Sequence, residues 1–338
     1  MLAAVLLVHP GSSVGCDVCA IYTATEVSEG RTGFRAAVGQ QFTRYLTEQV
    51  NGEEIPPFGE YLNSSITQFV LGYQFTNRVG LQLNIPFIAR TFRRLEDGRL
   101  ESGNSIGAGD LSLIGNLLAF DRVTERSVFL FSLLGGLKLP SGNPAFLGEE
   151  LDDDSAALAG QPARRALRGV AGHSTPGGDP DGDDGGPRQH GGVHGHDLAL
   201  GSGSVDGVVG GSIYWSYDRF FVTAALQYAI RREGAFEYRY ANDLTWVGGP
   251  GWYPLLTHDS TLGIQAVFSG ETKGKDTQAG QTLDDTGITA LYLGPGIRFS
   301  WGTQLSAELT GDLPFVQHNT ALQIVPNYRV RGGVIWRF

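Results

Sequence analysis

Apolar and polar side chains alternate along most of the chain from residue 31 onward. Residues 304–315 carry Leu, Ala, Gly or Phe at odd positions and polar residues or Pro at even positions, and residues 81–87 alternate similarly. A period of two is typical of a β-strand with one apolar face. The pattern predicts about twelve strands of roughly ten or more residues. These runs cover residues 32–45, 64–75, 79–92, 107–120, 127–139, 198–217, 220–231, 244–256, 261–270, 286–301, 304–315 and 325–338.

The length of these runs and the links between them favour a membrane barrel over a soluble β-sandwich. Strands of soluble proteins usually have about 5–6 residues, and these runs are about twice as long. Short breaks near residues 77, 121–124, 218, 258–259 and 302 alternate with longer links at residues 46–63, 93–106, 140–197, 232–243, 271–285 and 317–324. The predicted fold is therefore all-β: a single antiparallel transmembrane β-barrel of about 12 strands, with short periplasmic turns and long extracellular loops.

Both ends of the chain indicate export to the bacterial outer membrane. A short apolar run followed by small residues resembles the end of a secretory signal, so we expect a signal-peptide remnant at residues 1–15. A periplasmic N-terminal segment at residues 16–30 and the barrel at residues 31–338 would follow. The last run carries Tyr328, Trp336 and Phe338, which resemble the C-terminal aromatic signal read by the barrel assembly machinery. In a soluble sheet such an aromatic edge would invite aggregation.

The composition excludes several other classes of protein. The 338 residues are 41% hydrophobic and 18% charged, which argues against a disordered chain. The 49 glycines follow no strict period, so the chain is not collagen-like. The net charge of −10 argues against nucleic-acid binding, which needs clustered Lys and Arg. No run reaches the about 18 apolar residues that indicate a transmembrane helix.

Three glycine-rich stretches resemble a known family of outer-membrane proteins. They read GAGDLSL at residues 107–113, GGLKLPSG at residues 135–142 and LGSGSVD at residues 200–206. Their order and spacing are similar to those of the outer-membrane "MetA-pathway of phenol degradation" transporter family. The resemblance implies a barrel that passes small, often aromatic or hydrophobic, compounds. From the residues alone, the glycines are expected to let strands bend and approach closely at barrel corners.

The polar faces of the predicted strands supply candidates for the lining of a pore. If such residues face one another across a narrow lumen, they could select solutes by charge and size, as charged rings do in channels. The alternative is that they pair and only brace the barrel wall. The candidate pore-lining residues are Gln82, Asn84, Asp110, Lys138, Arg231, Arg298, Glu308, Asp312, Arg329 and Arg331.

Cysteines and histidines suggest two further sites. Cys16 and Cys19 form a Cys-x-x-Cys pair without a following His, so a small disulfide is expected, with a metal site or redox role as alternatives. The link at residues 140–197 is rich in His, Asp and Gly, and we expect a long, disordered extracellular loop there. Its histidines could capture Zn or Cu weakly, or could simply be solvated. They are His173, His190, His194 and His196.

The sequence therefore predicts an outer-membrane channel or transporter for passive passage of small solutes. No Ser, His and carboxylate fall together in the expected topology, so we do not expect an enzyme. We also expect no cofactor apart from a weakly held metal on the loop. The alternatives are a surface metal-binding barrel and a structural barrel without transport.

Overall fold

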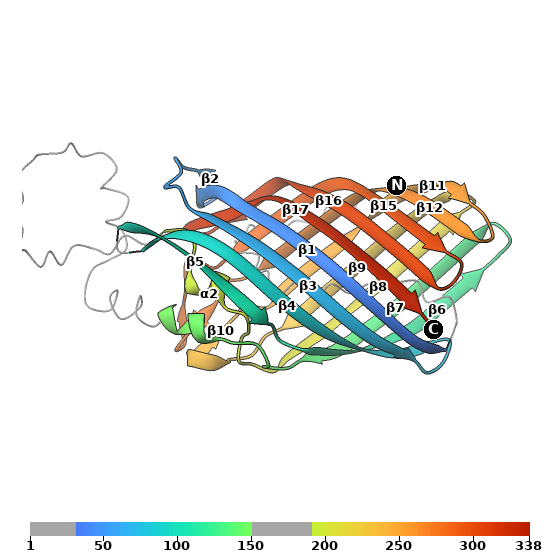
Figure 1. The fold of residues 1–338 in the computed structure, drawn as a ribbon, viewed down its shortest axis with the longest axis horizontal. Helices are drawn as coiled ribbons and strands as arrows, with labels where there is room; N and C mark the ends of the chain where they lie inside the picture. Colours follow the sequence, from blue (N-terminus) through green and yellow to red (C-terminus); the bar gives the residue numbers. More distant parts are fainter. Residues whose placement is uncertain (1–31, 97, 151–190) are drawn as a thin grey trace, which may run out of the picture.

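A computed structural model describes residues 32–96, 98–150 and 191–338 of the chain. Twelve antiparallel strands close into one barrel, as predicted (Figure 1). The wall strands in chain order are β1 (Gly33–Val50), β3 (Tyr61–Gln74), β4 (Val79–Glu96), β6 (Ser112–Val123), β7 (Ser127–Lys138), β8 (Asp206–Tyr217), β9 (Phe220–Ile230), β11 (Asp243–Leu256), β12 (Ser260–Lys273), β15 (Ile288–Trp301), β16 (Leu305–Asn319) and β17 (Leu322–Arg337).

The barrel closes between its first and last strands. β1 pairs with β17 over the register from Arg35 opposite Arg337 to Val50 opposite Leu322. Each other wall strand pairs with the strands before and after it in the wall. Closure leaves the wall without a free edge along most of its circumference, which removes the aggregation risk of an open sheet.

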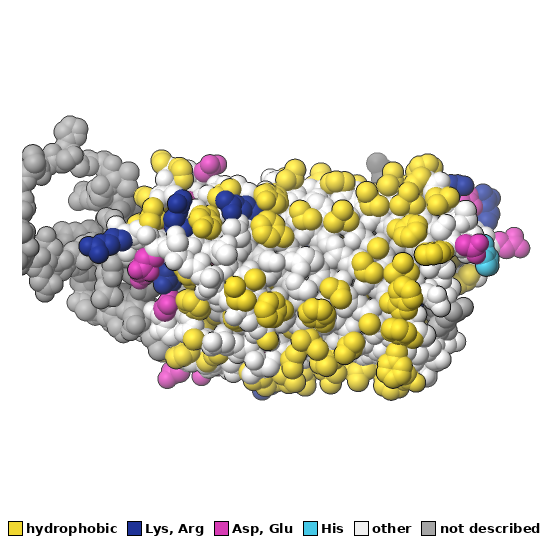
Figure 2. Space-filling view, viewed as in Figure 1, with side chains coloured by type: hydrophobic (Ala, Val, Ile, Leu, Met, Phe, Trp, Pro, Cys, Tyr) yellow, Lys and Arg dark blue, Asp and Glu magenta, His cyan; other side chains and the backbone are white. Residues whose placement is uncertain are grey.

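The period-two pattern sends apolar side chains outward and polar side chains inward. On β9, Leu226 is 50% exposed, whereas the next residue, Gln227, is 5% exposed. Figure 2 shows hydrophobic side chains spread over the outer surface and charged side chains gathered toward the two ends. Such an outer surface is stable only in lipid, because water would solvate it poorly. The chain is therefore a barrel of the bacterial outer membrane.

Tight turns join the strands at the end where β17 finishes, and longer connections lie at the opposite end (Figure 1). By the rule for bacterial barrels, the tight turns face the periplasm. Two predicted long links differ from the structure. Residues 317–324 contain only a tight turn at Thr320 and Ala321, and residues 93–106 form a hairpin of β4 with β5 (Arg99–Ala108). The strands continue to pair beyond the part of the barrel that faces lipid. Their outward side chains need not be apolar there, so the sequence pattern did not show these parts of the strands.

Small elements occupy the extracellular end. They are β2 (Glu53–Glu54), η2 (Ala145–Gly148), α2 (Gly195–Leu198), η4 (Ala235–Glu237), β10 (Tyr238–Arg239), β13 (Thr277–Gln278) and β14 (Gln281–Thr282). Figure 1 shows α2 and β10 at this end of the barrel. Within the described residues, the helices are all too short or too polar to cross a membrane. Two predicted strands also begin later than expected, because residues 198–205 and 109–111 lie outside strands.

Candidate functional site in the barrel lumen

The described parts of the β7–β8 connection fold into the extracellular mouth of the barrel. We call residues 143–150 and 191–200 the cap. Its side chains Leu147 and Leu198 are fully buried, and Val193 is 3% exposed. Leu198 and Val193 pack against inward-facing side chains of the wall, including Tyr45 and Phe92. The cap therefore shares a hydrophobic core with the wall and lies inside this end of the lumen.

The predicted disorder of residues 140–197 is wrong for the described residues 140–150 and 191–197. The link is polar on average, but its two ends contain a few apolar residues that an average over the whole link does not show. Burying each of these against the wall stabilises the folded cap by about 1.5–3 kcal/mol. The rest of the predicted loop, residues 151–190, lies outside the described residues.

Two histidines of the cap pair with carboxylates, one within the cap and one outside it. His196 Nδ1 lies 2.9 Å from Glu150 Oε1, and His194 Nδ1 lies 3.5 Å from Asp285 Oδ2. The two imidazole rings stack with their centres 5.5 Å apart. Burial lowers the pKa of His196, but Asp197 and Glu150 outweigh it and raise that pKa to about 10. Burial raises the pKa of Glu150, but the two histidines outweigh it and lower that pKa to about 2.

These pKa shifts predict how pH changes the stability of the cap. The pKa of His196 is raised, so its contribution is complete below about pH 6.5 and is lost as the pH rises toward about 10. The pKa of Glu150 is lowered, so its contribution is complete above its ordinary pKa of 4.5 and is lost as the pH falls toward about 2. We expect the cap to be most stable between these limits, and conductance through purified barrels to rise on the alkaline side.

A His196→Gln variant should conduct more at pH 6 and lose most of this alkaline dependence. The control is His258→Gln, because His258 is fully exposed in a periplasmic turn beside Asp259. An unchanged pH profile in His196→Gln would contradict the assigned role of His196.

The structure describes only two of the four histidines that were predicted to bind metal. His194 and His196 are buried in the mouth and paired with carboxylates, so they do not lie on an exposed loop. In the described residues, no group of three or more His, Cys, Asp or Glu side chains has a geometry that could hold a metal ion. His173, His190, Cys16 and Cys19 lie outside the described residues, so metal capture and the disulfide stay predictions.

The three glycine-rich stretches meet at one buried ionic network below the cap. Lys138 Nζ lies 2.7 Å from Asp110 Oδ2 and 2.9 Å from Asp206 Oδ2. Ser202 donates its backbone N–H to Asp110, as does Gly142. The network thus ties both ends of the β7–β8 connection to the wall. The sequence showed these stretches but not their convergence, which depends on the strand register.

Arg231 extends this network along the wall. Its guanidinium lies 3.0 Å from Asp206 Oδ2 and 2.6 Å from Asp243 Oδ2. Ser204 donates a hydrogen bond to the other oxygen of Asp206. Predicted pore residues Asp110, Lys138 and Arg231 therefore brace the wall and the cap. Because each charge has several partners, their burial costs less free energy than burial of isolated ions would.

The wall has a break beside this network. Within the part of the chain that the structure describes, β5 pairs with β4 alone, and β6 takes over the pairing with β4 after residues 109–111. Ser105 of β5 donates a hydrogen bond to the carbonyl of Leu198 in the cap. Gly109 fits closely here, because a Cβ atom would lie 2.8 Å from Ile88. The cap therefore covers the inner side of the strand that lacks a second partner.

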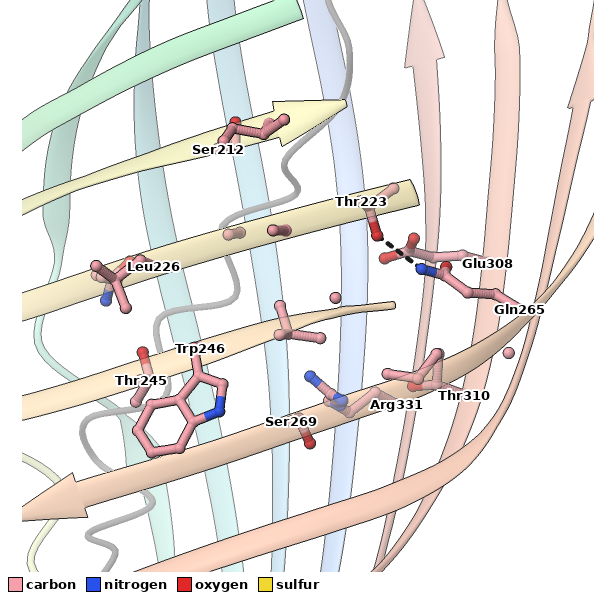
Figure 3. Close-up of a pocket in the computed structure, with 18 of the residues that line it drawn as sticks. Ser212, Thr223, Leu226, Thr245, Trp246, Gln265, Ser269, Glu308, Thr310 and Arg331 are labelled. Carbon is pink, nitrogen blue, oxygen red and sulfur yellow. Dashed lines mark hydrogen bonds between the residues drawn. The ribbon is translucent and has the colours of Figure 1, made fainter. Parts of the chain in front are cut away.

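A cavity of about 170 Å³ lies in the middle of the lumen. Figure 3 shows Gln265, Glu308 and Arg331 projecting into it from strands around the barrel. Arg331 lies 2.5 Å from Asp312 Oδ2, and Arg329 lies 2.9 Å from Glu271 Oε1. These ion pairs leave a polar lining with little net charge.

A larger hollow of about 1100 Å³ lies at the periplasmic end. Its lining includes residues of the tight turns, among them Arg126, Asp218 and His258. Arg298 and Glu308 line both hollows, so these residues lie between them, and we call this place the passage. The larger hollow thus lies at the periplasmic end of the lumen, and the cap lies in the extracellular mouth.

The remaining predicted lining residues lie elsewhere on the inner wall. Gln82 accepts a hydrogen bond from Arg35 at 2.7 Å and donates one to Asn84 at 3.0 Å. Both amide side chains are buried, so they stabilise the wall near β3 and β4. Only Arg298, Glu308, Arg329 and Arg331 of the predicted set line the central cavity.

Comparison with known proteins supports the fold. No family model matches the sequence. No curated protein matches it either. The structure is similar to the COG4313 outer membrane channel from Pseudomonas putida F1, with a TM-score of 0.56 and 14% identity over 91% of this chain and 96% of that one.

Two further solved barrels have lower TM-scores. The CymD monoaromatic hydrocarbon channel gives a TM-score of 0.37 and 8% identity over 98% of this chain and 95% of that chain. A Pseudomonas aeruginosa FadL homologue gives a TM-score of 0.33 and 8% identity over 91% of this chain and 90% of that one. At these identities the likeness concerns the fold alone. The predicted outer-membrane barrel is confirmed, and the resemblance to the phenol-degradation family stays a prediction.

Proposed function

We propose that this barrel is an outer-membrane channel that passes small solutes passively. The observation that carries the proposal is the lumen itself: a central cavity and a periplasmic hollow that share four lining residues, with polar side chains from many strands around them. A barrel of twelve strands is wider than the barrels of about 8 strands whose interior is filled by side chains, so it has room for a solute.

The dimensions and lining limit the solutes. The cavity of about 170 Å³ suits a small molecule rather than an oligosaccharide or peptide. Its inner wall mixes ion pairs with apolar side chains such as Leu134 and Val267, which favours solutes that carry both apolar and polar parts. One solved structure similar to this chain is an outer membrane channel by name, which is compatible with a channel function.

The cap gives the channel a closed state. A solute from outside must displace it or pass beside it, near the break between β5 and β6. Because the cap is not part of the wall, it can move while the barrel stays closed as a sheet. We therefore expect low basal flux and an increase when the cap is loosened.

Swelling of liposomes that contain the purified protein tests this proposal. Glycine and arabinose should enter faster than in empty liposomes. Ala225 and Val222 both lie on β9; Ala225 lines the cavity, whereas Val222 is exposed and lines neither hollow. Ala225→Trp should therefore slow swelling strongly, while Val222→Trp should leave it unchanged. Swelling no faster than in empty liposomes would favour the structural barrel.

We also propose that the protein is not an enzyme. Ser202 and Ser204, in the glycine-rich stretch closest in pattern to a nucleophile, are hydrogen-bonded to Asp110 and Asp206 within the anchoring network. His258 and His318 lie at opposite ends of the barrel, in a periplasmic turn and at the extracellular end of β16. Within the described residues, the hydrogen bonds of both serines go to the anchoring network and involve no histidine.

A further inference from the structure

Arg298 stands at the passage between the central cavity and the periplasmic hollow. Arg298 and Glu308 come from β15 and β16, and Leu130 and Tyr214 come from β7 and β8; all four line both spaces. A solute that leaves the cavity toward the periplasm must pass these side chains. They are therefore placed to determine which solutes cross.

Arg298 is more loosely paired than the other two arginines that line the cavity. Its nearest carboxylate oxygen, on Glu308, is 3.6 Å away, and its side chain is 28% exposed. By contrast, Arg329 is 2.9 Å from its partner and 8% exposed, and Arg331 is 2.5 Å from its partner and 13% exposed. A guanidinium with an exposed surface and a distant partner can still form a close, charge-assisted hydrogen bond with an anion.

An aromatic cluster lies beside this guanidinium. Arg298 lies over the ring of Phe221 at 5.8 Å, and Phe221 packs on Tyr253 at 4.5 Å and on Tyr214 at 6.4 Å between ring centres. The hydroxyl groups of Tyr214 and Tyr253 are 2.9 Å apart, which fixes the two rings.

A glycine makes room for this arrangement. Gly263 pairs with Arg298 in the strand register. A Cβ atom at Gly263 would lie 3.1 Å from Tyr253 and 3.2 Å from Phe221. The rings therefore occupy the space beside Arg298 that a side chain would otherwise fill, and aromatic surface and positive charge lie together.

We propose that this passage binds small planar aromatic anions. The carboxylate of such a solute pairs with Arg298, and its ring packs against Tyr214. Glu308 competes with the solute for Arg298, which keeps binding weak enough for release, as conduction requires. This inference deepens the proposed channel function by naming its solute class.

Titration calorimetry on the purified full-length barrel in detergent tests the site with benzoate as the probe. Benzyl alcohol has the ring without the charge, and acetate has the charge without the ring. We expect benzoate to bind more tightly than either by about tenfold, because a charge-assisted hydrogen bond and ring packing both contribute. Equal binding of benzoate and acetate would overturn the role of the rings.

Variants that remove a positive or a negative charge from the passage should change benzoate binding in opposite directions. Arg298→Gln should weaken benzoate binding by about tenfold, and Glu308→Gln should strengthen it, because the competing carboxylate is removed. Tyr214→Ala should weaken binding of benzoate but not of acetate, and Tyr214→Phe should restore it. Arg126→Gln is the control, because it removes a positive charge from the exposed periplasmic rim. Benzoate binding that is the same in Arg298→Gln and wild type would overturn the proposal.

The proposed channel function and the proposed anion site can be tested independently of each other. Liposomes that swell in arabinose, combined with no benzoate binding, would keep the channel and reject the anion site. Benzoate binding that depends on Arg298, combined with no solute flux, would keep the site and reject the channel.

Discussion

Replacing Leu198 with Asp is expected to open the extracellular mouth of the barrel. Leu198 is fully buried in the core that the cap shares with the wall. A carboxylate there loses the apolar contacts and has to be buried without a partner, which together cost about 3–5 kcal/mol or more. A shift of this size raises the open population by more than about a hundredfold.

Single-channel recording in planar bilayers measures the effect. Leu198→Asp should give longer and larger open events than wild type, while the folded protein keeps its heat-modifiable mobility on gels. Phe58→Asp is the matched control: the same charge is added at the same end, but Phe58 is 46% exposed. Equal conductance in wild type and Leu198→Asp would show that the cap does not limit passage.

Replacing Lys138 with Met is expected to give the largest loss of stability in the wall. Lys138 is 2% exposed and lies between Asp110 and Asp206, which are also buried. Removing one partner of a buried ion pair leaves uncompensated charge and typically costs about 3–5 kcal/mol. Because Asp110 also accepts the backbone N–H groups of Gly142 and Ser202, the cap should loosen as well.

Urea unfolding followed by gel mobility measures this loss. Adding Asp110→Asn and Asp206→Asn to Lys138→Met should restore part of the stability, because the unpaired charges are removed together with the lysine. Arg126→Met is the exposed control, since Arg126 and Asp218 pair at the periplasmic rim. If Lys138→Met unfolded at the same urea concentration as wild type, the network would not anchor the connection.

The wall of the barrel could be predicted from the sequence because lipid imposes a local rule. Outward side chains within the membrane are apolar and inward side chains are polar. The alternation of apolar and polar residues along the sequence therefore shows where each strand lies and which of its side chains face lipid. The last strand is an example: Tyr328 and Trp336 alternate with inward residues and are 39% and 46% exposed. Whether Phe338 and these residues act as an assembly signal stays a prediction.

The cap could not be predicted because its stability comes from distant parts of the chain. Leu147 and Leu198 belong to apolar runs of only three residues, 145–147 and 198–200, and they are buried because the mouth of the barrel supplies apolar partners. The same is true of His196, whose partner Glu150 is distant in sequence. Average composition therefore suggested a solvated loop.

The sequence also did not show which inward polar residues brace the wall and which line the cavity. Arg298 and Arg231 both lie on inward faces, and nothing local distinguishes them. Strand register places Arg231 between Asp206 and Asp243, where it is enclosed, and places Arg298 beside Gly263, where it reaches the passage. The sequence therefore predicted that both side chains point inward. It did not predict that Arg231 braces the wall and that Arg298 lines the cavity.

Amide hydrogen exchange of the intact protein in lipid nanodiscs tests most directly whether the extracellular mouth is closed by a folded cap. Peptides from residues 191–205 should exchange nearly as slowly as those from the wall strands, since most of these residues are buried and several of their backbone groups are hydrogen-bonded. The tight turn at residues 257–259 provides the fast reference. Exchange of residues 191–205 within seconds, as fast as that turn, would contradict the closed mouth.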